Sequence, residues 1–133
     1  MKIDGRCHCG GITYQAEVDP DGVIICHCTD CQTLTGSAFR ATIPASAQSF
    51  ALTSGAPSIY LKTAASGAQR AHAFCPHCGA PIYAAAPINP QTYSLRVGAI
   101  AQRAALRPSR QIWTRSALPW VFELGAAPGS PEQ

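Results

Sequence analysis

Short apolar segments alternate with turn residues along most of the chain. Two of them, residues 12–18 and 92–97, alternate apolar and polar residues one by one, which is the period of a half-buried β-strand. Further strand-like segments lie between Gly- and Pro-containing turns at 23–26, 38–43, 49–52, 58–62, 71–74, 82–85 and 111–114. Many short strands spaced by about eight to twelve residues are typical of an all-β sandwich, barrel or folded-over sheet.

One short helix is expected directly after the strand at 23–26. The segment Thr29-Asp30-Cys31-Gln32 fits a capping box, in which Thr29 caps the helix and the Gln32 side chain reaches back to it. Gly36 suits the position just past a helix end, where left-handed backbone is common. The pattern therefore predicts a helix of about two turns over residues 30–35.

The length of 133 residues is that of a single domain. We expect one zinc-binding β domain over residues 1–124, followed by a disordered tail over 125–133, where Pro and Gly occur without apolar periodicity. Charged residues make up only 13% of the chain, about half the usual share. This low content is compatible with a homo-oligomer, although Ala, Ser and Thr can also fill a surface.

The positive charge is modest and dispersed. The net charge is +3, whereas nucleic-acid-binding domains usually carry a dense basic stripe, so we expect no nucleic-acid partner. No segment approaches 18 consecutive apolar residues, and residues 1–11 contain no apolar signal core. We therefore expect no membrane association and a cytoplasmic location. The basic residues include one loose group, which we interpret as an ordinary solvated face: Arg103, Arg107, Arg110 and Arg115.

Cysteine is the most informative residue type. The number of cysteines is seven, so disulfides alone would leave one unpaired. In a reducing compartment, clustered cysteines indicate metal ligands rather than disulfides. The seven are Cys7, Cys9, Cys26, Cys28, Cys31, Cys75 and Cys78.

The first constellation joins two pairs that are distant in sequence. Cys75 and Cys78 form a zinc knuckle, in which Gly79 permits the left-handed backbone that closes the turn. Cys7 and Cys9 can also chelate where a strand bends. The four thiolates make the closed tetrahedral set of a structural zinc site. The alternative is four buried free cysteines.

The second constellation is compact. Cys28 and Cys31 are three residues apart across the helix start and face the same way, and Cys26 ends the preceding strand. Three protein ligands with one vacant position are typical of a catalytic zinc. The alternative is a second structural site completed by a histidine.

The four histidines and Arg40 are further candidate site residues. His8 and His27 each lie between two cysteines, so on extended backbone their side chains point away from the metal. His77 is expected to face solvent, and His72 to be an ordinary surface or core histidine. Arg40 could hold a substrate carboxylate bidentately, but a solvated arginine is the favoured interpretation.

The cysteine motifs resemble those of the glutathione-dependent formaldehyde-activating enzyme family. The similarity extends over nearly the whole chain. It is seen at residues 5–11 (GRCHCGG), 26–32 (CHCTDCQ), 35–39 (TGSAF), 74–79 (FCPHCG), 112–113 (IW) and 118–120 (LPW).

This resemblance implies an Mss4-like fold of folded-over antiparallel β-sheets with one short helix, stapled by zinc. It implies a structural zinc at Cys7, Cys9, Cys75 and Cys78, and a second, catalytic zinc at Cys26, Cys28 and Cys31. The implied activity is the formation of S-(hydroxymethyl)glutathione from formaldehyde and glutathione, with glutathione as co-substrate.

The resemblance, together with the vacant position at the three-cysteine site, leads us to expect a zinc-dependent carbon–sulfur lyase or synthase with a small-molecule thiol substrate. Thiolate is a soft ligand that zinc accepts readily, so a substrate thiol suits the vacant position. Three thiolates leave such a site with a charge of about −1, which disfavours hydrolysis by zinc hydroxide. The alternatives are a non-enzymatic zinc-binding module, since fold alone does not give function, and a glutathione or zinc carrier without turnover.

Overall fold

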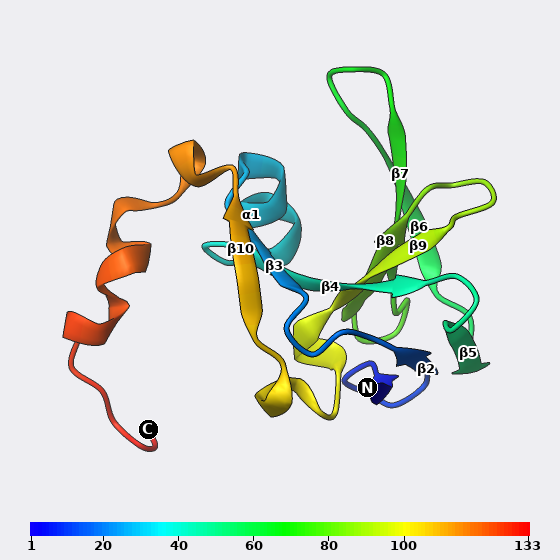
Figure 1. The fold of residues 1–133 in the computed structure, drawn as a ribbon, viewed down its shortest axis with the longest axis horizontal. Helices are drawn as coiled ribbons and strands as arrows, with labels where there is room; N and C mark the ends of the chain where they lie inside the picture. The colour runs from blue at the N-terminus through cyan, green and yellow to red at the C-terminus, as the bar shows by residue number, and fades with distance from the viewer.

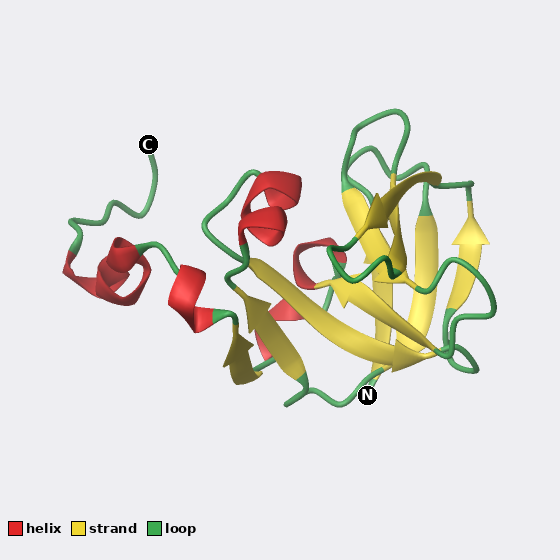
Figure 2. Ribbon diagram, turned by 90° about the horizontal axis from the view of Figure 1, so that it is seen from above, coloured by secondary structure: helices red, strands yellow, loops and turns green.

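The chain forms ten β-strands in two sheets. Figures 1 and 2 show how the strands are arranged. The structure is a computed structural model that describes residues 1–133. The smaller sheet has the strand order β1 (Lys2–Arg6), β2 (Thr13–Glu17), β5 (Ala51–Ser54). The larger has the order β10 (Pro108–Ile112), β3 (Val23–Cys26), β4 (Arg40–Ser46), β9 (Thr92–Arg96), β8 (Pro81–Ala85), β7 (Gln69–Phe74), β6 (Ser58–Thr63).

The helices are short. There is one α-helix, α1 (Thr29–Thr35), and four 3₁₀-helices: η1 (Val97–Ala99), η2 (Arg103–Ala105), η3 (Thr114–Ser116) and η4 (Pro119–Ala126). The expectation of a mainly β fold with two sheets and one short α-helix is thus confirmed. None of these helices is long and apolar enough to cross a membrane.

An apolar core of fifteen buried residues lies between the two sheets. Ile3 and Tyr14 contribute from the small sheet, and Ile43 and Leu95 from the large one. Each is at most 1% exposed, and full burial of such a side chain contributes about 1.5–3 kcal/mol. Gly5 is the cross-strand partner of Tyr14, and it leaves room for the Tyr14 ring to lie directly over its Cα.

The opposite face of the large sheet is polar and cationic. Residues paired across strands point to the same side, as do residues two apart on one strand, so Cys26, Arg40, Arg96, His72 and Lys62 share one face. The pairs that define it are Cys26–Arg40, Thr42–Arg96, Ala84–Ser94, His72–Ala84, Tyr60–His72 and Lys62–Arg70. Helix α1 lies against this face, where Asp30 pairs with Lys62.

Helix α1 starts one residue earlier than the sequence predicts. Its N-cap is Cys28, whose Sγ accepts a hydrogen bond from the backbone N–H of Cys31 at 3.3 Å. Thr29 is already helical, so the expected capping box is wrong. The Gln32 side chain instead donates to the carbonyl oxygens of His27 (2.8 Å) and Ser116 (3.0 Å). Gly36 does end the helix, with φ of +62°.

Four strands differ from the sequence analysis. β1 was not predicted, and three others are displaced by two or three residues: β4 covers 40–46 rather than 38–43, β5 covers 51–54 rather than 49–52, and β10 covers 108–112 rather than 111–114. β10 also pairs with β3 in parallel, whereas the other pairs are antiparallel. A parallel edge strand follows from the long connection between β9 and β10, which carries η1 and η2 and returns the chain to the far edge of the sheet.

Residues 113–126 form an arm that extends from the end of β10 away from the two sheets (Figures 1 and 2). Two contacts tie this C-terminal arm to the region of α1. Gln32 donates to the Ser116 carbonyl oxygen, and the Phe122 ring lies 5.7 Å from the His27 ring, centroid to centroid. The arm is therefore anchored beside the compact cysteine cluster.

Candidate functional site

Cys7, Cys9, Cys75 and Cys78 converge into a four-cysteine cluster. Their sulfurs all lie within 4.8 Å of one another, with 3.5 Å between Cys7 and Cys9 and 3.8 Å between Cys9 and Cys75. Four sulfurs arranged as a tetrahedron around an ion at about 2.3 Å are about 3.8 Å apart. The spacing and the soft donors therefore fit a tetrahedral thiolate site.

Two similar turns place these sulfurs. After β1, the Cys7 carbonyl accepts from Gly10 N–H and the Cys7 N–H donates to the Ile12 carbonyl, at 3.1 and 3.0 Å. After β7, the Cys75 carbonyl accepts from Gly79 N–H at 2.9 Å and the Cys75 N–H donates to Ala80. Gly79 has φ of +75°, as the sequence analysis expected of a residue that closes the knuckle.

The protonation of this cluster is uneven. Hydrogen bonds from the backbone of Cys9 and Ala80 lower the pKa of the Cys78 thiol to about 6. A backbone hydrogen bond from Gly11 favours the Cys9 thiolate, yet the neighbouring sulfurs outweigh it and raise the pKa of Cys9 to about 11. A bound cation would relieve this mutual repulsion among thiolates.

Cys26, Cys28 and Cys31 form a three-cysteine cluster at the start of α1. Their sulfurs also lie within 4.8 Å of one another. Cys26 ends β3, Cys28 caps the helix and Cys31 lies in its first turn. Burial raises the pKa of Cys31, whereas hydrogen bonds from the Cys31 side chain and backbone outweigh burial and lower the pKa of Cys28. Three soft donors in this arrangement can hold a thiophilic metal ion.

None of the four histidines belongs to either cluster. His27 is fully buried, and its Nε2 lies 2.7 Å from Gln111 Oε1, between the rings of Phe39 and Phe122. His8 and His77 are exposed. His27 is thus turned away from the cysteines on either side of it, as its position between them suggested.

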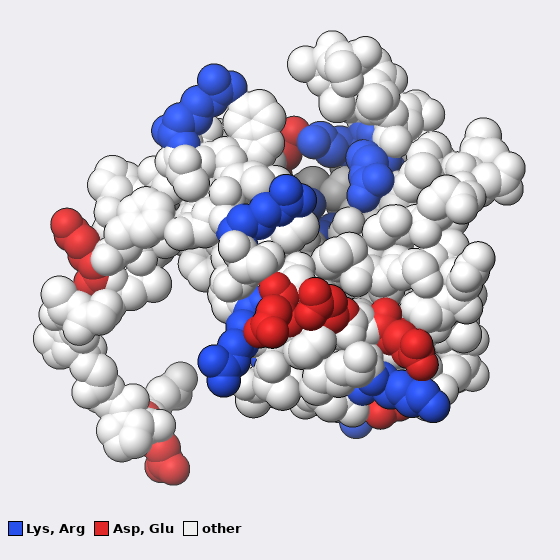
Figure 3. Space-filling model, viewed as in Figure 1, with Lys and Arg blue, Asp and Glu red and all other residues white.

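Arg40 is buried, so the interpretation as a solvated arginine is wrong. It is 9% exposed and Arg96 is 6% exposed. The two arginines line two cavities of about 760 and 350 Å³, which also share Thr35 and Pro81. We call these two adjoining cavities the arginine recess. Figure 3 shows Lys and Arg side chains gathered around a hollow between the regions of α1 and β7.

The recess lies beside the three-cysteine cluster without including its sulfurs. Cys7 and His8 belong to the wall of the larger cavity, but Cys7 is only 1% exposed. Arg40 provides the connection to the other cluster, because it is the cross-strand partner of Cys26. Directly paired residues of an antiparallel sheet have Cα atoms about 4.5–5.5 Å apart.

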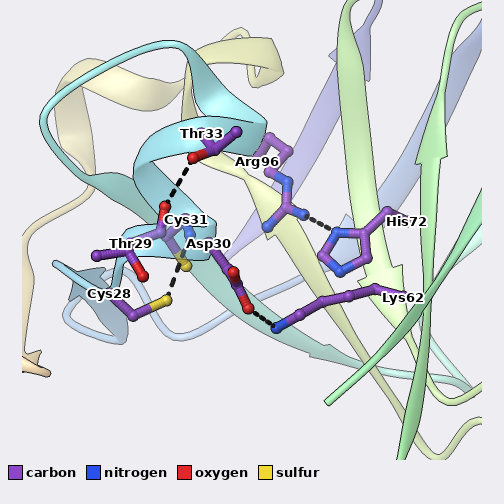
Figure 4. A network of polar contacts seen from close by, with 8 residues as sticks. All are labelled: Cys28, Thr29, Asp30, Cys31, Thr33, Lys62, His72 and Arg96. Carbon is purple, nitrogen blue, oxygen red and sulfur yellow. Dashed lines mark hydrogen bonds and ion pairs between the residues drawn. The ribbon is translucent and has the colours of Figure 1, made fainter. Parts of the chain in front are cut away.

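A polar network crosses the space between α1 and the sheet (Figure 4). Lys62 Nζ lies 2.7 Å from Asp30 Oδ2, and Arg96 Nη2 donates to His72 Nδ1 at 3.1 Å. Burial, followed by repulsion from Arg40 and Arg96, lowers the pKa of His72 to about 4. Burial and repulsion from Arg40 likewise lower the pKa of Arg96 to about 9. At neutral pH the histidine is neutral and the arginine charged.

Residues 2–116 match the family described as glutathione-dependent formaldehyde-activating enzyme. The chain belongs to this family. The match includes both cysteine clusters, Arg40, Arg96 and His72, so the resemblance noted from the cysteine motifs is confirmed.

A crystal structure of a Rhodobacter sphaeroides protein has a similar fold, with a TM-score of 0.59 and 21% sequence identity over 79% of this chain and 97% of that chain. No curated protein matches this chain.

Sequence reasoning found the cysteines of this family member and missed the arginine recess. Arg40 and Arg96 are separated by more than fifty residues of sequence, and neither occurs in a recognisable motif. One signal was available, since both arginines lie in strand-like segments of the sequence. Alternation, however, predicts burial only for the apolar side of such a strand, and the arginines occupy the polar side.

Proposed function

We propose that the protein is a zinc-dependent carbon–sulfur lyase or synthase that acts on a thiol adduct, such as S-(hydroxymethyl)glutathione. The observation that supports this most strongly is the three-cysteine cluster, which provides three sulfur ligands rather than four. A chain that needed only a structural staple would have it in the four-cysteine cluster. The second cluster, in a member of this family, favours chemistry with a thiol.

Each cluster has a separate proposed role. Cys7, Cys9, Cys75 and Cys78 would hold a structural zinc, and Cys26, Cys28 and Cys31 the second zinc. Zinc bound by three thiolates accepts a further sulfur ligand and lowers the pKa of that thiol. Arg40, the cross-strand partner of Cys26, has no ion-pair partner. Its positive charge offsets part of the negative charge of the clustered sulfurs.

The proposed reaction joins a thiol and an aldehyde. The substrate sulfur bonds to the carbonyl carbon, the electron pair of the C=O bond moves to oxygen, and the proton lost by the thiol ends on that oxygen. The lyase direction reverses these steps. The recess beside Arg40, at about 350 Å³ in its smaller cavity, provides space for the substrate within the protein.

Turnover must be separated from binding, because thiols add to aldehydes without a catalyst. Exchange NMR measures the rate at which formaldehyde and glutathione interconvert with their adduct, with and without protein. We expect wild-type protein to raise this rate and Cys28→Ser to abolish the increase. Serine is itself a good N-cap, so this variant removes a sulfur and retains the start of α1. An unchanged rate with wild-type protein would leave a binding module or carrier as the function.

Cobalt substitution tests the vacancy in the second cluster directly. Sulfur-to-cobalt charge transfer absorbs strongly and grows with each thiolate bound. We expect glutathione to increase this band in wild-type protein, but not in Cys28→Ser, with total cobalt measured in parallel to detect metal stripping. No increase in the wild type, at constant cobalt, would mean that the cluster is already four-coordinate and structural.

A further inference from the structure

The two buried arginines of the recess have no ion-pair partner. Nε of Arg40 and Nε of Arg96 are both buried without any hydrogen-bond partner. The molecule has one ion pair, Lys62–Asp30, and it involves neither arginine. The Arg96 guanidinium has one side-chain contact, to His72 Nδ1 at 3.1 Å, and this partner is neutral at pH 7.

The residues that line the recess add positive charge, and the negative groups that interact with Arg40, namely Asp30 and the Cys31 sulfur, lie outside its walls. Arg6 and Arg103 also line the larger cavity, whereas no Asp or Glu lines either cavity. Water entering the recess can accept hydrogen bonds from the guanidinium groups, but it cannot neutralise them. Four arginines and no carboxylate in the cavity walls leave an excess of positive charge, which favours an anion in the recess.

The geometry of the two arginines suits a planar oxyanion. Arg40 on β4 and Arg96 on β9 project from adjacent, hydrogen-bonded strands onto one face. A guanidinium presents its N–H donors as a rigid fork that matches a carboxylate bidentately. Arginines on a sheet are held in place more firmly than those on loops, which favours a specific ligand over a diffuse ion.

The recess is also adjacent to the proposed thiol site. Arg40 is paired with Cys26, the first residue of the three-cysteine cluster. An anionic group held by Arg40 and a sulfur held at the cluster would therefore lie close together. One small molecule that contains both groups a few bonds apart can reach the two sites at once.

We propose that Arg40 and Arg96 form the site that binds a carboxylate group of the thiol substrate. The anion site is argued from the arginines alone. Only its link to a thiol rests on the proposed function. In this arrangement Arg40 and Arg96 are specificity-determining residues that select charged thiols over neutral ones of the same size.

A thiol-free probe tests the anion site separately from the chemistry. The arginine Nε–H signals are recorded by ¹H–¹⁵N NMR during titration with glutarate, inorganic phosphate, uncharged glutaramide, or chloride at equal ionic strength. We expect glutarate to shift the Arg40 and Arg96 signals and to leave exposed Arg110 unchanged. Glutarate shifts no larger than those caused by chloride would overturn the proposal, as would binding of phosphate without binding of glutarate.

Variants connect the signals to affinity. Arg40→Gln should weaken glutarate binding about tenfold or more, as expected when a charged hydrogen-bonding partner is lost. Arg40→Lys retains the charge but not the fork and should bind with intermediate affinity. Arg110→Gln, an exposed arginine on β10, is the matched control and should bind as the wild type. Circular dichroism checks that all three variants are folded. Equal affinity of Arg40→Gln and wild type would contradict the assignment.

Turnover then tests the substrate class. With formaldehyde as the aldehyde, 3-mercaptopropionate is compared with 3-mercaptopropionamide, which has the same size but no charge. We expect a lower KM for the carboxylate, and we expect Arg40→Gln to raise that KM about tenfold and to reduce the ratio of the two KM values toward one. Turnover of both thiols with equal KM would overturn the inference and leave the proposed function standing. Glutarate binding without turnover of either thiol would retain the anion site and refute the proposed function.

Discussion

Gly5 permits the buried position of the Tyr14 ring on the neighbouring strand. A Cβ added at Gly5 would lie 1.9 Å from Cζ of the Tyr14 ring, which is far inside van der Waals contact. Tyr14 is 1% exposed and stays in the core only because its cross-strand partner has no side chain. The ring also packs against Phe50, at 5.6 Å between centroids.

We expect Gly5→Ala to destabilise the protein by about 3 kcal/mol, because overpacking a core forces side chains off their rotamers or moves the backbone. Chemical denaturation followed by circular dichroism measures this. Gly98→Ala is the matched control, since a Cβ there has no neighbour within 4 Å. Equal stability of the two variants would mean that the β1–β2 pair adjusts without strain.

His72 should remain neutral in the folded protein down to about pH 4. Its normal pKa is about 6.5, so the unfolded chain takes up the proton first as the pH falls. The contribution to stability is therefore complete above pH 6.5 and is lost progressively toward pH 4. The charged groups around it are Arg40, Arg96, Lys62 and Arg70, with Asp30 on α1.

An NMR titration of the His72 imidazole checks this directly. His72→Gln lacks the titrating imidazole, so it should lose less stability than the wild type between pH 7 and pH 5. The cysteine clusters are the same in both proteins, so their contribution cancels in the comparison. A His72 titration midpoint at or above 6.5 would refute the prediction.

Helix α1 is short, and its two ends determine where the three-cysteine cluster lies. The N-terminal cap is Cys28, and the C-terminal cap is Gly36 in left-handed backbone. Between them, Thr35 Oγ1 donates to the Cys31 carbonyl at 2.7 Å, which fixes the last turn to the turn that contains the buried cysteine. A helix of this length depends on its caps and on tertiary contacts.

Gly36→Ala should therefore cost about 1 kcal/mol, from the left-handed backbone alone, because a Cβ at Gly36 meets nothing within 4 Å. Gly36→Asn should be nearly neutral, since asparagine tolerates this conformation. The denaturation midpoints of the two variants decide the point. An equal loss of stability in both variants would mean that side-chain contacts, and not the left-handed backbone at Gly36, cause the destabilisation.

At the level of elements, the sequence pattern predicted those strand and helix boundaries that depend on neighbouring residues in the chain. The strand at Val23–Cys26 was placed at the observed residues and Gly36 was recognised as the helix end. β1 was missed because Lys2–Arg6 is short, polar and interrupted by Gly5. The parallel pairing of β10 depends on where a long connection returns, which the sequence does not state.

The cysteine constellations were predicted as sets, because chelating spacing is a local property that two turns then bring together. The helix cap was wrong, because Cys28 Sγ takes the role that a hydroxyl normally fills. The burial of Arg40 was also missed. Alternation identifies a polar face of a strand, but only the packing of α1 over that face removes it from water.

At the level of the whole molecule, the four-cysteine cluster connects the two sheets, whereas the three-cysteine cluster connects neighbouring elements of the chain. The four-cysteine cluster joins the chain after β1, in the small sheet, to the chain after β7, in the large sheet. Cys9 and Cys75 are 66 residues apart in sequence. The three-cysteine cluster joins only the end of β3 to the helix that follows it.

Loss of the first cluster should therefore unfold the protein, whereas loss of the second should not. We expect Cys75→Ser to be insoluble or to lack cooperative unfolding, because metal binding at a site of this kind is part of the folding free energy. Cys28→Ser should melt cooperatively, with a loss of at most about 1 kcal/mol, because serine preserves the cap. Circular dichroism, melting curves and metal content per chain check both variants. An equal loss of structure in the two would contradict this division.

The C-terminal arm determines which part of the structure tryptophan fluorescence reports. The chain has two tryptophans, Trp113 and Trp120, and both lie in the arm, 51% and 52% exposed. The aromatic residues of the core are instead tyrosine and phenylalanine, such as Tyr14 and Phe50. Tryptophan emission thus follows the docking of the arm beside α1, and the unfolding of the sheets must be followed by the backbone signal or by tyrosine.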